Sequence, residues 1–199
     1  MAISAADVKK LREQTGAGML DCKNALTEAN GDFEEAVATL RKKGISVAAK
    51  REGKTASQGV VTSYIHAGGQ IGVLVEVNCE TDFVAKTEDF QGFAREIAMQ
   101  VAAQQPRWVS KDEVPADALD KERQILKEQA LNEGKPANIV EKMVEGRMNK
   151  FYETYCLLNQ PYIRDDSKTI EDLLNDLLAK TGEKVIVRRF VRFQVGEEL

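Results

Sequence analysis

Hydrophobic residues in the first part of the chain recur at three- and four-residue intervals, which is typical of helices that bury one face. The clearest stripe consists of Phe33, Ala36, Val37 and Leu40. Asp32 stands just before this stripe, at the position of an N-cap, and Gly44 is expected to end the helix. Two shorter helical patterns precede it, so the sequence predicts three helices within residues 1–54.

The hydrophobic period changes after residues 48–57, a polar stretch that we expect to be a linker. Apolar and polar residues alternate on both sides of a glycine pair, which predicts a β-hairpin over residues 60–77. Helical patterns follow until the alternation returns over residues 184–195, which predicts a long final strand. The expected fold class is α+β, with a three-helix, ubiquitin-associated-like domain at 1–54 and an antiparallel sheet with packed helices at 55–199.

The charge balance argues against a nucleic-acid binder. The 199 residues carry a formal net charge of −4, and the 28 Lys and Arg residues are spread along the chain, without the concentrated basic face that phosphate binding needs. No apolar run is long enough to cross a bilayer, and the N-terminal residues lack the order of a signal peptide. We therefore expect a cytoplasmic protein with no membrane and no direct nucleic-acid contact, which leaves protein partners open.

The obvious candidates for chemistry are Cys22, Cys79, Cys156 and the single histidine, His66. The cysteines are odd in number and far apart, which suits a reducing compartment better than a disulfide framework. A metal site needs ligands at short spacing, such as Cys-x-x-Cys, and none occurs, so no metal or cofactor is predicted. A thiol nucleophile would need the fold to bring a cysteine and His66 together, which the sequence leaves open. The simpler interpretation is that the cysteines are buried hydrophobic residues and His66 ends a strand.

Two connections carry apolar residues that could contact a partner. Segment 79–86 joins the predicted hairpin to a helix and places Phe83 beside Asp82. An aromatic residue there either packs into its own core or projects as an anchor for a partner's pocket, and both interpretations stay open. Met19 and Leu20 follow a turn, where core packing is the more common use of apolar residues and partner contact is the alternative.

Two sequence motifs resemble the signatures of a known family. Residues 8–23 read V-K-K-L-R-E-Q-T-G-A-G-M-L-D-C-K, and residues 77–85 read V-N-C-E-T-D-F-V-A. Both resemble signatures of the elongation factor Ts family, and together they are highly specific. Shorter matches follow in the family's order at N-E-G-K-P (132–136), E-G-R-M (145–148) and L-N-Q-P (158–161), so the resemblance spans nearly the whole chain.

The resemblance implies a non-catalytic translation elongation factor, a guanine-nucleotide exchange factor that binds elongation factor Tu and promotes GDP release. In the family, the Thr-Asp-Phe-Val segment is associated with dislodging Mg²⁺ from the GTPase. The matching residues here are Thr81, Asp82, Phe83 and Val84. The family's N-terminal contact surface maps onto Arg12, Met19 and Leu20, of which Leu20 replaces the commoner Met.

The chain departs from the long form of the family, in which the core is doubled and a helical hairpin is inserted. Only one unit of β-hairpin plus helix is expected here, and short members are similar and compensate by dimerising. The resemblance therefore implies a homodimer and a two-plus-two complex with the GTPase, with the long final strand as a means of pairing. The alternative is a ubiquitin-associated-type adaptor without exchange activity, which explains the first segment but leaves Thr81 to Val84 unexplained.

Overall fold

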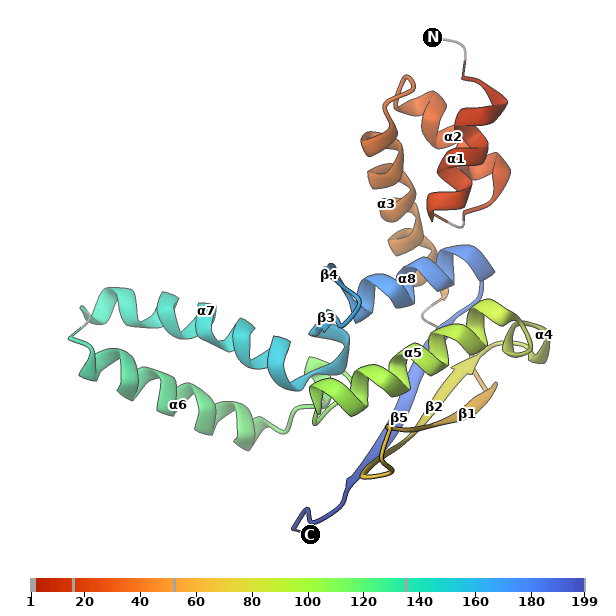
Figure 1. Ribbon diagram of the computed structural model, residues 1–199. Coiled ribbons are helices and arrows are strands. Elements are labelled where there is room, and N and C mark those ends of the chain that lie inside the picture. The colour runs from red at the N-terminus through yellow and green to blue at the C-terminus, as the bar shows by residue number, and fades with distance from the viewer. Residues whose placement is uncertain (1–2, 16, 52, 135, 199) are drawn as a thin grey trace. The chain divides into compact units, whose positions relative to one another are not determined.

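The computed structural model describes residues 3–15, 17–51, 53–134 and 136–198 (Figure 1). The mixed α+β fold expected from the sequence is confirmed. The helices of four or more residues are α1 Ala5–Thr15, α2 Met19–Glu28, α3 Phe33–Arg51, α4 Asp82–Ala85, α5 Glu88–Gln104, α6 Ala116–Asn132, α7 Ala137–Tyr155 and α8 Ile170–Thr181. The strands are β1 Gln58–Ile65, β2 Ile71–Cys79, β3 Pro161–Tyr162, β4 Asp165–Thr169 and β5 Val185–Gln194.

Capping side chains explain where the first helices begin. The Ser4 hydroxyl accepts a hydrogen bond from the Asp7 amide at 3.1 Å, and the Asp7 carboxylate accepts one from the Ser4 amide at 3.1 Å. This reciprocal pair is a capping box, and it fixes the start of α1. The Asp32 carboxylate accepts from the Glu35 amide at 2.9 Å and caps α3 as predicted. The three helices enclose a shared core that includes Leu11, Leu26 and Ala36, each no more than 1% exposed.

The prediction that Gly44 ends the third helix is wrong. Helix α3 continues to Arg51, so the stretch predicted as a linker is helical over its first four residues. A Cβ atom on Gly44 would lie 3.2 Å from the Cβ of Ala179, which shows that the glycine lets α3 approach helix α8 closely. A contact with a residue so distant in the sequence gives no local signal, which is why the glycine looked like a helix end.

The predicted β-hairpin is formed by β1 and β2, and β5 completes a three-stranded sheet in the order β1-β2-β5. The turn between β1 and β2 contains Gly68 and Gly69 at φ values of 89° and 70°, a conformation that favours glycine. Strand β5 is therefore an edge strand, and the alternation over its residues predicted it correctly. Strands β3 and β4 form a separate two-stranded hairpin that the sequence pattern did not indicate.

The chain divides into two compact units. The first comprises the chain up to Thr62, Val75–Glu96 and Asp172–Arg188; the second comprises Ser63–Leu74, Ile97–Glu171 and the chain from Arg189 onwards. Each unit has buried apolar residues of its own, such as Val77 and Phe90 in the first and Ile97 and Leu157 in the second, all fully buried.

Helices α6 and α7 pack against each other within the second unit as a helical hairpin (Figure 1). The expected departure from the long form of the family therefore does not extend to this hairpin. At its base, Trp108 and Tyr155 lie against Phe151, with ring centroids 6.1 and 5.0 Å from the Phe151 ring. Nearby, Gln100 and Gln160 bury their amide groups and hydrogen-bond to each other at 3.2 Å, which satisfies polar atoms that would be costly to leave unpaired. No described helix is long and apolar enough to cross a membrane.

Candidate partner-binding site

The segment that joins β2 to α5 forms a capped helical turn. Thr81 has an extended backbone, and its hydroxyl accepts a hydrogen bond from the Val84 amide at 3.3 Å, so Thr81 is the N-cap of α4. Three residues later, the Thr87 hydroxyl donates to the Val84 carbonyl at 2.8 Å and accepts from the Phe90 amide at 3.3 Å. The connection is therefore an ordered turn between two capping threonines.

The turn exposes its aromatic residue. The Phe83 side chain is 79% exposed, whereas Ala85 of the same turn is buried. Of the two interpretations left open for Phe83, the structure supports projection into solvent and excludes packing into the core of this chain. A large apolar side chain on a fixed backbone has the form of an interface anchor.

Asp82 precedes Phe83 and is paired within the turn. Its carboxylate accepts from the Lys86 ammonium at 2.6 Å, an i,i+4 pair on the surface. The hydrogen bond with Lys86 lowers the pKa of Asp82 below its ordinary value, so this carboxylate is ionised at neutral pH. The exposed face of the turn thus combines one aromatic ring with one balanced ion pair.

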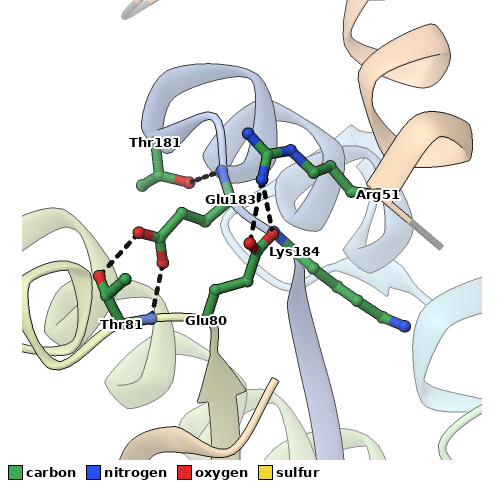
Figure 2. A network of polar contacts seen from close by, with 6 residues as sticks. All are labelled: Arg51, Glu80, Thr81, Thr181, Glu183 and Lys184. Atoms are coloured by element: carbon green, nitrogen blue, oxygen red, sulfur yellow. Dashed lines mark hydrogen bonds and ion pairs between the residues drawn. The ribbon is translucent and has the colours of Figure 1, made fainter. Parts of the chain in front are cut away.

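A network of polar contacts fixes the strand that leads into the turn (Figure 2). The Glu183 carboxylate accepts from the Thr81 amide at 3.0 Å and from the Thr81 hydroxyl at 2.7 Å. The neighbouring Glu80 carboxylate accepts from the Lys184 amide at 2.7 Å and pairs with the Arg51 guanidinium at 3.0 Å. Sequence reasoning missed Glu183, Glu80 and Arg51, because Glu183 and Thr81 are 102 positions apart and no motif links them.

The surroundings of Cys79 and Cys156 do not favour a reactive thiol. Burial, with a smaller contribution from Glu183, raises the pKa of Cys79 to about 11, and its Sγ donates to the Thr81 carbonyl at 3.1 Å. Burial also raises the pKa of Cys156 to about 11. The His66 ring lies at a strand end and is hydrogen-bonded to Tyr64 at 3.0 Å. A nucleophilic thiol needs the opposite setting, in which a base or a positive charge lowers its pKa. Within the described residues, no group of three or more His, Cys, Asp or Glu is arranged to hold a metal ion.

The N-terminal candidates lie on the surface of the three-helix bundle. Met19 and Leu20 open α2 and are 50% and 69% exposed, whereas Cys22 and Leu26 of the same helix face the core. Arg12 is exposed on α1. The interpretation of Met19 and Leu20 as core residues is therefore wrong, because the inner face of α2 is already filled. Exposed apolar residues side by side are compatible with a partner contact.

Comparison with known proteins gives matches along nearly the whole chain. Residues 2–197 match the family model described as Elongation factor TS. Elongation factor Ts of Caldanaerobacter subterraneus subsp. tengcongensis is 62% identical over 195 residues, which cover 98% of each chain. Elongation factor Ts of Moorella thermoacetica is 63% identical over 195 residues, which cover 98% of this chain and 96% of the relative. The protein of the same name from Syntrophus aciditrophicus is 58% identical over 199 residues, which cover 100% of this chain and 99% of the relative.

Proposed function

The chain belongs to the elongation factor Ts family, and we propose that it is a guanine-nucleotide exchange factor that binds elongation factor Tu and promotes GDP release. Family membership makes it a protein of translation elongation. The observation that carries the proposal further is the exposed Phe83 on a capped turn, within the motif that the family associates with the Mg²⁺ site of the GTPase. No covalent chemistry, cofactor or metal ligand is required of this chain.

In the proposed mechanism, this chain and the nucleotide compete for binding to the GTPase. A P-loop GTPase holds its nucleotide through backbone amides, a lysine and a Mg²⁺ that bridges the phosphates. A partner that binds the nucleotide-free form more tightly weakens nucleotide binding by the same factor, because coupling between two sites is reciprocal. Phe83 supplies apolar binding energy by inserting near the Mg²⁺ site, and Thr81, Asp82 and Val84 hold the shape of the turn that presents it.

The N-terminal helices provide a second contact. Arg12, Met19 and Leu20 are exposed on the bundle within residues 1–54, and we assign them to a separate patch of the same partner. Residues 55–199 carry the Phe83 turn. Two contacts on one chain increase the overall affinity for the partner, because binding at one contact raises the effective concentration at the other. The place of action would be the cytoplasm, where translation takes place, with no direct contact to nucleic acid.

A homodimer is the proposed assembly, which gives a two-plus-two complex with the GTPase. Strand β5 lies at the edge of its sheet, and its last part carries exposed apolar residues, among them Phe193 at 62%. An edge strand with exposed apolar side chains can pair with the same strand of a second copy.

Release of labelled GDP from elongation factor Tu tests the function. The chain should accelerate release at concentrations well below that of the nucleotide complex, because an exchange factor dissociates and acts again. An adaptor of the ubiquitin-associated type would bind its target without changing the release rate. Binding without acceleration would therefore refute the exchange function and favour the adaptor.

A further inference from the structure

We propose that Glu183 is a positioning residue, which orients the Thr81 hydroxyl and thereby holds the turn that presents Phe83. The inference rests on the proposed function and adds a residue from outside the family motif. Glu183 itself lies just after helix α8, whereas Phe83 lies in α4, and both belong to the first unit. Figure 2 shows Glu183 pointing towards Thr81 and away from Arg51.

The geometry around Thr81 depends on which atom donates. A threonine hydroxyl has one proton to donate and lone pairs to accept with. As an N-cap, Thr81 must accept from the Val84 amide, which it does at 3.3 Å. Its proton must then go elsewhere, and it goes to Glu183 at 2.7 Å. The carboxylate thus selects the hydroxyl orientation in which Thr81 caps α4.

The position of Glu183 suits an acceptor with two oxygens. Both contacts are donated by Thr81, one from its amide and one from its hydroxyl, and they end on different oxygens of the carboxylate. A carboxylate accepts at both oxygens, whereas the amide of glutamine has one acceptor and one donor. A glutamine at this position could accept only one of the two hydrogen bonds that Thr81 donates to Glu183, so the second would be lost or reversed.

The backbone that carries Glu183 is itself well fixed. Gly182 directly follows the last residue of helix α8, has a φ of 69°, and its amide donates to the Leu178 carbonyl at 2.8 Å. The Glu183 amide then donates to the Thr181 hydroxyl at 3.4 Å. The left-handed conformation of Gly182 fixes the backbone from which the Glu183 side chain extends. The Glu183 carboxylate therefore connects the end of α8 to the turn that carries Phe83.

Glu80 offers a matched control within the same network. It is also a half-buried glutamate, next to Thr81 in the chain, but its carboxylate bonds to the Lys184 amide and to Arg51 and not to Thr81. Removing Glu80 should loosen the ends of β2 and β5 while leaving the cap of α4 in place. A comparison of variants at Glu80 and Glu183 therefore distinguishes a general loss of stability from a loss of the cap that orients the turn.

The test is a double-mutant cycle on GDP release from elongation factor Tu. Glu183→Ala should lower the stimulated release rate about fivefold, the change in population that follows from loss of a typical N-cap. In a Phe83→Ala background the same substitution should have almost no further effect, since the residue that it positions is gone. Glu183→Gln should lie between the wild type and Glu183→Ala. Glu80→Ala should lower the melting temperature by about as much as Glu183→Ala. Any effect of Glu80→Ala on the GDP release rate should be the same in the wild-type and in the Phe83→Ala background.

A second measurement tests the role of Glu183 in the chain alone, without elongation factor Tu. Hydrogen exchange at the Val84 amide should become faster in Glu183→Ala and stay unchanged in Glu80→Ala, because only the former frees the Thr81 hydroxyl. Unchanged Val84 exchange in Glu183→Ala, or an equal loss of activity with and without Phe83, would overturn the positioning role. A wild-type chain that fails to accelerate GDP release refutes the proposed function instead, and Val84 exchange then still decides whether Glu183 holds the turn.

Discussion

Phe83 and Ala85 lie on opposite faces of the four-residue helix α4. Phe83 is 79% exposed and Ala85 is 6% exposed, as expected for two helical residues about 200° apart. The small residue faces the core and anchors the turn, so the large one is free to contact another molecule. This division of roles separates folding from binding within a single turn.

Phe83→Ala should reduce the stimulation of GDP release about thirtyfold, which corresponds to the loss of ~2 kcal/mol from one anchor residue. Its fold should be unaffected, because the ring makes little contact with its own chain. Circular dichroism and thermal melting test this point. Phe90→Ala is the contrasting variant, since Phe90 is fully buried and its truncation should cost about 3–5 kcal/mol of stability. A melting temperature for Phe83→Ala as low as that of Phe90→Ala would identify Phe83 as a core residue.

The contact surface of the bundle should behave differently from the Phe83 turn. Leu20→Ala should raise the half-saturating concentration about fivefold, a typical loss for an exposed apolar anchor, while the maximal release rate stays near that of the wild type. Titration of the chain against a fixed amount of nucleotide complex separates the two quantities. Leu26→Ala, on the buried face of the same helix, should instead lower the melting temperature. Equal loss of maximal rate in Leu20→Ala and Phe83→Ala would contradict the division into two contacts.

Deleting residues 1–54 should leave a folded core that binds the GTPase more weakly. The buried residues of the sheet and of helix α5, such as Val77 and Phe90, all lie beyond the deletion. The deletion also removes the close contact of Gly44 with Ala179 of α8, so the fragment should melt at a lower temperature than the whole chain. It removes Arg51 from Glu80 as well, but this pair is partly exposed and should contribute little to stability. Circular dichroism of the fragment is the check. An unfolded fragment would show that the first helices are part of the core and that the boundary near residue 54 is misplaced.

The features that the sequence predicted correctly all depend on local patterns. The stripe that contains Phe33 and Leu40 gives α3, and the alternation around the glycine pair gives the β1–β2 hairpin. The features that it missed depend on contacts between distant residues. Gly44 lies inside α3 at a close contact with Ala179, and Thr81 is oriented by a glutamate 102 positions away. Strand β3 was missed because two residues are too few to show a period.

The sequence predicted only part of the candidate site, because the burial of its residues depends on contacts with distant parts of the chain. The motif identified the segment around Phe83, but no pattern could decide whether the ring is buried, because this depends on what fills the core. Ala85 and Phe90 fill it. The same logic applies to Leu20, whose exposure follows from the burial of Cys22 and Leu26 on the other side of α2.

The buried thiols should make the fold less stable in alkaline solution. Burial raises the pKa of Cys79 and of Cys156 from the ordinary value of 9.0 to about 11. Above pH 9 the unfolded chain therefore loses these protons first, so the stability that they provide is fully present below pH 9 and is lost as the pH rises to about 11. Urea denaturation at several pH values measures the slope. The double variant Cys79→Ala, Cys156→Ala should show a shallower slope, and an unchanged slope would assign the effect to other groups.

Our prediction of the oligomeric state starts from exposed apolar residues in the second unit. Strand β5 is the edge of its sheet, and Val191 and Phe193 in its last part are exposed, as is Val195 just beyond its end, the last two at 62% and 72%. Ile65 on β1 and Leu74 on β2 belong to the same unit and are exposed as well. Several exposed large apolar residues on the strands of one unit are compatible with an interface.

We therefore expect a homodimer that forms through the C-terminal strand. Light scattering at micromolar concentration should give twice the chain mass of 22.1 kDa. Val191→Pro removes a backbone donor from β5 and should return the mass to that of a single chain. Because proline could also disturb the sheet, Phe193→Asp tests the same surface without changing the backbone, and Ile139→Asp, an exposed apolar residue of α7, is the matched control. A wild-type mass of a single chain would refute the dimer. A doubled mass that survives Phe193→Asp and Val191→Pro would place the interface away from β5.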